Sequence, residues 1–234
     1  MKAFLLAAGD GTRLWPITKS IPKCLVPVRG EPMLGIWLEL CRRSGINEVM
    51  VNLHAHADTV RHFLSGHEFG IKVQIAEEPS LLGSAGTLFA NRHWVERDPY
   101  FWIFYADVLT NTDLDKMRVF HERSGMGATL GVYEVPDPSR CGIALVDENE
   151  IVYKFVEKPT TPVSNLAFSG LMIMSRTIIA ELPTTTPADL GFDVIPRLCG
   201  RMVVYRISDY LVDVGVMANY KRVQASWPGL PKAA

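Results

Sequence analysis

The chain has 234 residues, of which 48% are apolar, so it can bury a substantial core in one large domain or two small ones. Its 24 basic and 25 acidic side chains leave a formal charge of −1, which argues against nucleic-acid binding because a polyanion requires a basic stripe. No run of about 18 apolar residues is present, so no membrane span is expected. A single nucleotide needs only a few local positive groups and stays compatible with this charge.

The first half of the chain alternates strands with helices. Apolar runs and alternating patterns predict strands at residues 2–8, 48–53, 71–76 and 101–111. Apolar residues at helical spacing predict helices at residues 32–44, 57–64 and 85–95. This alternation indicates the α/β class, with a parallel sheet covered by helices on both faces.

The second half changes character and carries more strand-like segments with short turns. Strands are predicted at residues 127–135, 143–147, 151–159 and 168–175, and helical patterns return near 176–182, 188–199 and 217–226. The connecting segments are too short for separate folding units, so this half is expected to be a lid or subdomain on the same sheet. We predict one domain over residues 1–226 and a loop-like, mobile tail over residues 227–234.

Two features favour a cytoplasmic location. The apolar N-terminus becomes polar after eight residues, so it is interpreted as a buried strand and not as a signal peptide. The cysteines, Cys24, Cys41, Cys141 and Cys199, are widely spaced and include no CxxC pair. Reduced thiols are therefore expected, without a zinc or redox motif.

The segment after the first predicted strand carries the ingredients of phosphate binding. Gly9 and Gly11 let backbone N–H groups converge on an anion, and Arg13 can clamp phosphate oxygens in a bidentate manner. Lys23 follows between two stiffening prolines. Leu14 occupies the third glycine of a G-x-G-x-x-G motif, which disfavours a Rossmann oxidoreductase, and a P-loop is also absent. From these residues alone, a phosphate turn and a plain glycine turn with solvated cations both stay open.

Longer motifs are much more specific. The segments LAAGDGTRLWPIT (6–18) and PKCLVPVRGEPML (22–34) resemble, with matching spacing, the signature of the sugar-1-phosphate nucleotidyltransferases. Similar motifs follow in EEPSLLGSAGTL (77–88), YADVLTN (105–111), FVEKP (155–159), FSGLMIMS (168–175) and LVDVGVMANY (211–220). The resemblance covers residues 1 to about 222. It implies a Rossmann-like, three-layer α/β/α sandwich with a mixed, mainly parallel sheet.

The resemblance implies a reaction in which an NTP and a sugar 1-phosphate give an NDP-sugar and pyrophosphate. The attacking phosphate oxygen is already anionic, so catalysis depends on positioning and on neutralising charge. By resemblance, Asp107 and Asp213 hold one Mg²⁺, a cation that prefers hard oxygen ligands. Asp107 also ends a predicted strand, where α/β sheets place their ligands. Without the resemblance, Asp213 would be interpreted as a cap of the helix near residue 217.

The resemblance also implies the roles of single residues. The catalytic candidates besides Asp107 are cations: Arg13 for the β- and γ-phosphates, Lys23 for the α-phosphate and Lys158 for the sugar 1-phosphate. Glu157 is expected to bind sugar hydroxyls, although the Glu157–Lys158 pair alone would be interpreted as a solvated turn. The other substrate-binding candidates are Ala8, Gly9, Gly11, Thr12, Gly83, Ser84, Gly86, Gly142, Ser169 and Gly170.

Substrate identity depends on finer features. The loop LGSAGTL resembles the guanylyltransferase version of the family loop, so we predict GTP as the NTP and mannose 1-phosphate, or a related hexose or heptose 1-phosphate, as the partner substrate. A uridylyltransferase acting on an amino-sugar 1-phosphate is the alternative. A non-catalytic sugar-nucleotide-binding homologue would be expected to lose Lys23, Asp107 or Asp213, and all three are present.

Departures from the family pattern bear on the substrate more than on the reaction. Cys24 and Ala106 replace a common proline and glycine, Ser169 stands near a common asparagine, and Leu211 replaces a frequent tryptophan. None of these removes a charged catalytic group. The sequence shows no hexapeptide repeat, so no attached β-helix domain is expected. It leaves open whether the chain forms a homo-oligomer.

Overall fold

The computed structural model describes residues 1–231 and divides the chain into two compact units. Unit 1 consists of Met1–Leu81, Phe104–Asp113 and the segment from Asp209 onward, and unit 2 consists of Leu82–Ile103 and Leu114–Ser208. The units alternate along the sequence. The expected single domain over residues 1–226 stays a prediction.

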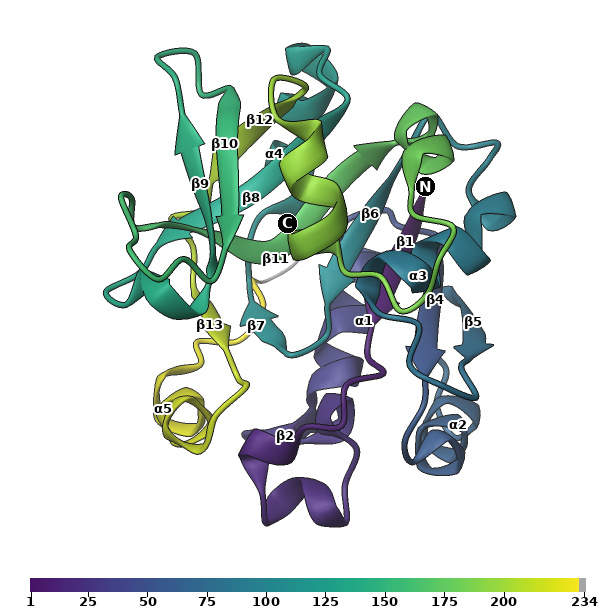
Figure 1. Ribbon diagram of the computed structural model, residues 1–234. Coiled ribbons are helices and arrows are strands. Elements are labelled where there is room, and N and C mark those ends of the chain that lie inside the picture. Colours follow the sequence, from purple (N-terminus) through teal and green to yellow (C-terminus); the bar gives the residue numbers. More distant parts are fainter. Residues whose placement is uncertain (232–234) are drawn as a thin grey trace. The chain divides into compact units, whose positions relative to one another are not determined.

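Unit 1 is built on parallel strands connected by helices (Figure 1). Its strands are β1 (Lys2–Leu6), β4 (Glu48–Leu53) and β5 (Lys72–Glu77), with β4 paired to both of the others in parallel. Helix α1 (Met33–Arg43) connects β1 to β4, and α2 (Ala57–Ser65) connects β4 to β5. Parallel neighbours require such crossovers, which explains why helical and strand periodicities alternate in this part of the sequence.

Short elements fill the long connection between β1 and α1. Three 3₁₀ turns come first: η1 (Thr12–Leu14), η2 (Ile17–Lys19) and η3 (Lys23–Leu25). A small hairpin follows, made of β2 (Pro27–Val28) and β3 (Glu31–Pro32). The phosphate-binding candidates of the first 25 residues therefore lie on tight turns and not on a long helix.

A second ladder of unit 1 joins distant parts of the sequence. Strand β7 (Val108–Thr110) pairs antiparallel with β13 (Leu211–Asp213), and α5 (Met217–Ser226) follows. The apolar side chains below this ladder form one buried cluster that includes Leu109, Val214 and Trp227. Each fully buried side chain of this size contributes about 1.5–3 kcal/mol, so the cluster holds the ladder firmly.

Unit 2 mixes antiparallel and parallel pairing. It contains α3 (Ser84–Ala90), η4 (Arg92–Trp94), α4 (Leu114–Ser124), β8 (Ala128–Glu134), η5 (Pro138–Arg140), β9 (Gly142–Val146), β10 (Val152–Glu157), β11 (Leu166–Ser175), η6 (Arg176–Glu181) and β12 (Met202–Arg206). Strands β9 and β10 form an antiparallel hairpin, β11 pairs antiparallel with β8 and β9, and β12 pairs parallel with β8.

The helix expected at residues 85–95 ends at Ala90 and is followed by η4, and the helical pattern near residues 176–182 is the 3₁₀ helix η6. Two other predicted elements differ more from the structure. The strand expected at residues 101–111 is divided into β6 (Tyr100–Tyr105) and β7 by a turn at residues 106–107. At the start of this turn, Ala106 N donates to the Leu6 carbonyl. The helix expected near residues 188–199 is a π-helical turn, η7 (Leu190–Val194), followed by a 3₁₀ turn, η8 (Ile195–Leu198). The proline near the start of η8 lacks an N–H group, which prevents a regular α-helix there.

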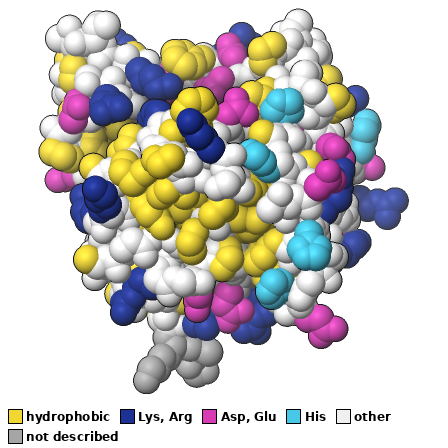
Figure 2. Space-filling view, turned by 90° about the horizontal axis from the view of Figure 1, so that it is seen from below, with side chains coloured by type: hydrophobic (Ala, Val, Ile, Leu, Met, Phe, Trp, Pro, Cys, Tyr) yellow, Lys and Arg dark blue, Asp and Glu magenta, His cyan; other side chains and the backbone are white. Residues whose placement is uncertain are grey.

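The predicted α/β, Rossmann-like fold with a mixed sheet is confirmed by the parallel strands and crossover helices of unit 1 and the mixed ladder of unit 2. Over residues 1–231, the helices are too short or too polar to span a membrane. On the face shown in Figure 2, basic and acidic side chains both lie around the margin of a hydrophobic area.

Candidate functional site

Two carboxylates of unit 1 are brought together by the pairing of β7 with β13. The register places Asp213 opposite Val108, and Val214 N donates to the Asp107 carbonyl at 2.8 Å. Burial raises the pKa of the Asp213 carboxyl, and the negative charge of Asp107 raises it further. The two predicted metal ligands therefore lie close enough for their charges to interact.

Two predicted cations lie beside this carboxylate pair. Lys23 Nζ donates to Asp107 Oδ2 at 2.5 Å, and the two side chains are only 12% and 28% exposed. A Cβ built on Gly215 would lie 2.6 Å from Asp213 Oδ1 and 3.1 Å from Arg13 Nη2, so this glycine lies close to both groups. The positive charges of Lys23 and Arg13 oppose the rise in the pKa of Asp213. Charges of both signs are thus concentrated at one place in unit 1.

The turn that carries Arg13 depends on Gly11. Gly11 has φ +66°, in the left-handed region, and a Cβ there would lie 3.0 Å from Lys23 Cβ. Thr18 Oγ1 donates to the Gly11 carbonyl at 2.7 Å, and Leu14 N donates to the same oxygen at 2.9 Å. The glycine thereby packs the predicted phosphate turn directly against the lysine segment.

Buried polar residues that the sequence did not single out hold the start of this turn. Asn52 Oδ1 accepts from Ala7 N at 2.6 Å, and Asn52 Nδ2 donates to Glu78 Oε1 at 2.9 Å. Asn52 and Glu78 are buried. The available signal was an amide, Asn52, among the apolar residues 49–51 and 53 of strand β4, because buried amides in proteins are nearly always hydrogen-bonded.

The alternative interpretation of Asp213 as a helix cap is not supported. Val216 is the residue at the N-cap position of α5, whereas Asp213 Oδ1 accepts from Gly215 N at 2.6 Å. Asp213 therefore shapes the turn before the helix. Cys24, which replaces a common proline, is buried, and burial raises the pKa of its thiol to about 12. It is a neutral apolar group beside Lys23.

In unit 2, the β9–β10 hairpin brings Glu157 to Gly142. These residues are direct partners in the ladder, and a Cβ built on Gly142 would overlap Glu157 Oε2. Burial raises the pKa of the Glu157 carboxyl, the positive charge of Lys158 lowers it and the negative charge of Asp189 raises it. Lys158 has φ +49°, a conformation that is strained for a residue with a side chain, and its N–H donates to the Cys141 carbonyl at 2.9 Å.

The other candidates of unit 2 lie on two further segments. Gly83, Ser84 and Gly86 form the start of α3, where Ser84 Oγ donates to Asp189 Oδ2 at 2.9 Å. Ser169 and Gly170 lie in the irregular part of β11, and Ser169 is buried with its Oγ accepting from Leu171 N at 3.2 Å. The sequence did not predict the involvement of Asp189, whose partner is more than 100 positions away.

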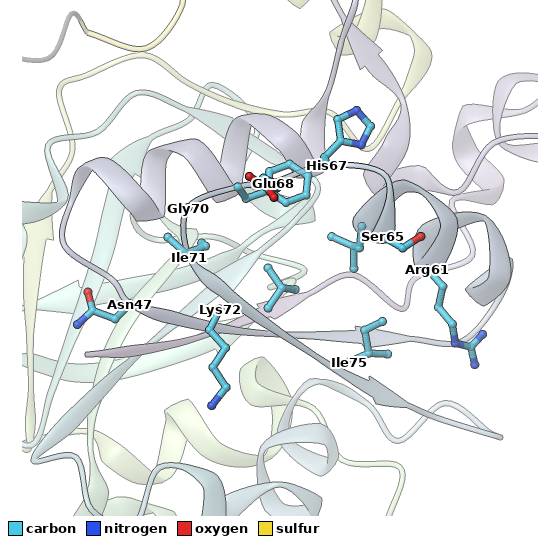
Figure 3. Close-up of a pocket in the computed structure, with 12 residues that line it drawn as sticks. Asn47, Arg61, Ser65, His67, Glu68, Gly70, Ile71, Lys72 and Ile75 are labelled. Atoms are coloured by element: carbon cyan, nitrogen blue, oxygen red, sulfur yellow. The ribbon is translucent and has the colours of Figure 1, made fainter.

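A separate groove of about 960 Å³ lies in unit 1 beside β5 (Figure 3). Its walls come from the end of α2, the following loop and β5, and the described residues that line it include none of the predicted site residues. Lys72 there pairs with Glu48 at 3.1 Å, and Arg61 pairs with Asp58 at 2.9 Å. The candidate site is therefore distinct from this groove.

Among residues 1–231 no group of three or more His, Cys, Asp or Glu side chains has the geometry of a metal cage. A site with two carboxylates is still adequate for Mg²⁺, which is usually held by one or two carboxylates together with phosphate oxygens and water. The four cysteines form no disulfide in the structure.

Comparisons with known proteins relate the chain to enzymes that act on sugar phosphates. The family model described as "Nucleotidyl transferase" matches residues 2–227. The chain is 32% identical over 241 residues to a UTP–glucose-1-phosphate uridylyltransferase of Synechocystis sp., covering 94% of this chain and 61% of that protein. It is 30% identical over 222 residues to the mannose-1-phosphate guanylyltransferase catalytic subunit beta of Xenopus tropicalis, covering 92% and 61%.

The chain therefore spans about three fifths of the length of the curated relatives it matches. Among solved structures, HddC from Yersinia pseudotuberculosis superposes with a TM-score of 0.82. That likeness covers 97% of this chain and 99% of the other at 24% identity, and it shows a shared fold.

Proposed function

Because the chain belongs to the nucleotidyl transferase family, we propose that it transfers a nucleotidyl group from an NTP to a sugar 1-phosphate. The family membership predicted from the motifs of the sequence is confirmed by the match over residues 2–227. The observation that carries the proposed activity is the cluster of charges in unit 1. Lys23 contacts Asp107 there, and the positive charges of Lys23 and Arg13 act on the carboxylate of Asp213. Phosphoryl chemistry requires this concentration of cations and hard oxygen ligands.

In the proposed reaction, a phosphate oxygen of the sugar 1-phosphate attacks the α-phosphorus of the NTP in line. The new bond forms between this oxygen and the α-phosphorus, and the bond to the β-phosphate oxygen breaks, so pyrophosphate leaves with the electron pair. The attacking oxygen is already anionic and needs no base. The protein's contribution is to bring two anionic substrates together and to offset their charge.

The cations have separate tasks in this proposal. Arg13 and the backbone of Gly9–Thr12 bind the β- and γ-phosphates, and the conformation of Gly11 keeps this turn compact. Lys23 binds the α-phosphate, where negative charge shifts during the reaction. Its close contact with Asp107 keeps its ammonium group oriented before the substrate arrives.

The donor set suits Mg²⁺. Asp107 and Asp213 offer hard oxygen ligands. Their two negative charges repel each other, and a divalent cation bound between them would offset this repulsion. When bound, Mg²⁺ would supply positive charge that neutralises the phosphate oxygens and orients them. The two carboxylates would hold the ion, while Arg13 and Lys23 act directly on the phosphates.

The sugar 1-phosphate is assigned to unit 2. Glu157, which is half-buried against Gly142, is proposed to accept hydrogen bonds from sugar hydroxyls. Lys158, held in a strained backbone conformation, is proposed to contact the sugar phosphate. Gly142, Ser169 and Gly170 complete the proposed sugar contacts.

For substrate identity we favour GTP and mannose 1-phosphate, or a related hexose or heptose 1-phosphate. The loop LGSAGTL, for which nucleobase binding is proposed, resembles the guanylyltransferase version of the family loop, and one relative is named a mannose-1-phosphate guanylyltransferase subunit. A second candidate is uridylyl transfer, including transfer to an amino-sugar 1-phosphate, because the relative at 32% identity is named a uridylyltransferase. A cytoplasmic location is part of this proposal, because widely spaced cysteines without a CxxC pair favour reduced thiols.

The test is a pyrophosphate-release screen of ATP, GTP, CTP, UTP and dTTP, each combined with a panel of sugar 1-phosphates and Mg²⁺. We expect release that requires both substrates and is fastest for GTP with a mannose-like 1-phosphate. Fastest release with UTP would favour the second candidate. Absence of release with every pair would refute the proposed activity, and release that persists without Mg²⁺ would refute the metal requirement.

A further inference from the structure

The turn Ala188–Phe192, which the sequence motifs did not single out, contacts two substrate-binding segments of unit 2. One is the segment Leu82–Gly86, for which nucleobase binding is proposed. The other is the pair Glu157 and Lys158, for which sugar-phosphate binding is proposed. One turn therefore lies against the residues assigned to both substrates.

Backbone hydrogen bonds join this turn to the segment before α3. Ala188 N donates to the Leu82 carbonyl at 2.9 Å, and the Ala188 carbonyl accepts from Ala85 N at 2.9 Å and Gly86 N at 3.2 Å. Gly83 has φ +77°, and a Cβ there would overlap the Ala188 carbonyl oxygen. The two segments are thus in backbone contact, and the glycine of the family motif is what permits the approach.

Asp189 divides its two carboxylate oxygens between two tasks. Oδ1 accepts from Gly191 N at 2.8 Å and Phe192 N at 3.1 Å, which holds its own turn. Oδ2 accepts from Ser84 Oγ at 2.9 Å, and Ser84 Oγ in turn accepts from Leu190 N at 2.7 Å. The Ser84 hydroxyl is therefore oriented by a carboxylate acceptor and a backbone donor at once, a charge-assisted arrangement.

The same turn contacts the sugar-phosphate residues with its other end. A Cβ built on Gly191 would overlap Glu157 Oε2, so the Glu157 carboxylate lies directly on the backbone of the turn. Lys158 Nζ lies 5.3 Å from the centroid of the Phe192 ring, within the range of a cation–π interaction. These contacts place Asp189 in a turn that touches both substrate segments and lies outside the motifs quoted from the sequence.

We propose that Asp189 is a positioning residue for recognition of the NTP: it holds Ser84, and through Ser84 the start of α3, in the conformation that accepts the nucleobase. This inference depends on the proposed function. Ordering the loop before substrate arrives lowers the entropic cost of binding, so loss of the Asp189–Ser84 bond weakens NTP binding and leaves the chemical step unchanged.

The decisive variant is Asp189→Asn. It keeps one carbonyl oxygen for Gly191 N and Phe192 N and replaces the acceptor that faces Ser84 with an N–H donor. Loss of one charge-assisted hydrogen bond corresponds to about a tenfold change. We expect the KM for the preferred NTP to rise about tenfold, with kcat and the KM for the sugar 1-phosphate within about twofold of wild type. Ser84→Ala should act similarly, and the double variant should be no worse than Ser84→Ala alone because both changes remove the same link.

Asp147→Asn is a matched control. Asp147 Oδ1 accepts from Asn149 N and Ile151 N, each at 2.9 Å, so its carboxylate supports an exposed turn in the same way. The control removes the same charge from a turn that does not hold Ser84, and its kinetic constants should equal those of wild type. If Asp189→Asn does not fold, Asp189→Glu, which keeps a carboxylate but displaces the oxygen that accepts from Ser84 Oγ, supplies the test through the same rise in the KM for the NTP.

Two results would overturn the inference. One is an unchanged KM for the NTP in a folded Asp189→Asn or Ser84→Ala variant, and the other is an equal rise in the KM of both substrates. Either result, obtained with an active wild-type enzyme, leaves the proposed function intact. A wild-type protein that transfers no nucleotide to any sugar 1-phosphate would instead refute the proposed function and this inference with it.

Discussion

Replacing Asp107 by asparagine should separate catalysis from stability. The change keeps the size of the side chain and removes the charge that faces Lys23 Nζ at 2.5 Å. It also removes the negative charge that, after burial, does most to raise the pKa of Asp213. The folded state therefore loses an attraction and a repulsion at the same time.

The two effects on stability largely offset one another. Leaving Lys23, which is 12% exposed, without its anionic partner costs about 1–3 kcal/mol. Relief of the repulsion between the two carboxylates returns about 1 kcal/mol. The net loss is then at most about 2 kcal/mol, which lowers the Tm of a chain of this size by less than about 8 °C.

The effect on catalysis should be much larger. In Asp107→Asn, the neutral amide would be a poor ligand for Mg²⁺ and would no longer orient Lys23, so kcat should fall at least about 100-fold. Pyrophosphate release with the preferred substrate pair measures kcat, and thermal unfolding measures Tm. Asp115→Asn is the control: Asp115 also pairs with a cation, Arg118 at 3.4 Å, but on the exposed surface of α4, where neither quantity should change. A kcat for Asp107→Asn within about threefold of wild type would refute the assignment.

Three further predictions follow from particular contacts. Gly11→Ala should lower the free energy of unfolding by about 1–2 kcal/mol and raise the KM for the NTP, because φ is +66° and Lys23 Cβ would be 3.0 Å from the new methyl group. Thermal melts measure the first effect and steady-state kinetics the second. An unchanged KM would contradict the role of the turn. Because burial raises the pKa of Glu157, the folded state binds this proton more tightly than the unfolded state, and the contribution of this group to stability falls as pH rises from its unfolded-state pKa, about 4.3, toward its raised folded-state pKa. Glu157→Gln should flatten this slope in melts from about pH 5 to about 8 while raising the KM for the sugar 1-phosphate; an unchanged slope would contradict the pKa direction. Trp227→Ala should lower the free energy of unfolding, measured in urea, by about 3–5 kcal/mol, because Trp227 is 4% exposed in the core cluster. A loss below about 1 kcal/mol would contradict the importance of this side chain for the packing of the cluster.

Sequence periodicity predicted the bounds of an element well where the element's own residues show a clear helical or strand pattern. The bounds of β4 (Glu48–Leu53) and α5 (Met217–Ser226) match the predicted ranges, because each has a clear pattern and a natural end. Strands β12 and β13 were not predicted, since short strands are stabilised by partners far away in the sequence. The predicted helix near residues 188–199 followed apolar spacing; Asp189 caps a π-helical turn there, and Pro196 prevents a regular α-helix beyond it.

The candidate site was predicted in part. Resemblance to family motifs pointed to Lys23, Asp107 and Asp213, and the β7–β13 ladder explains why residues so far apart in the sequence interact. Asn52 and Asp189 were missed because they act on neighbouring turns and their partners are identified only by the fold. A single sequence shows which residues could carry chemistry more readily than which residues hold them in place.

The most direct test of the central claim follows the oxygen atoms of the sugar 1-phosphate. Mannose 1-phosphate labelled with ¹⁸O in its phosphate group is incubated with GTP, Mg²⁺ and the enzyme, and the products are analysed by mass spectrometry. Attack of the sugar phosphate on the α-phosphorus predicts that all the label enters the NDP-sugar and none enters pyrophosphate. Label in pyrophosphate, or cleavage of the NTP without any NDP-sugar, would contradict the proposed reaction.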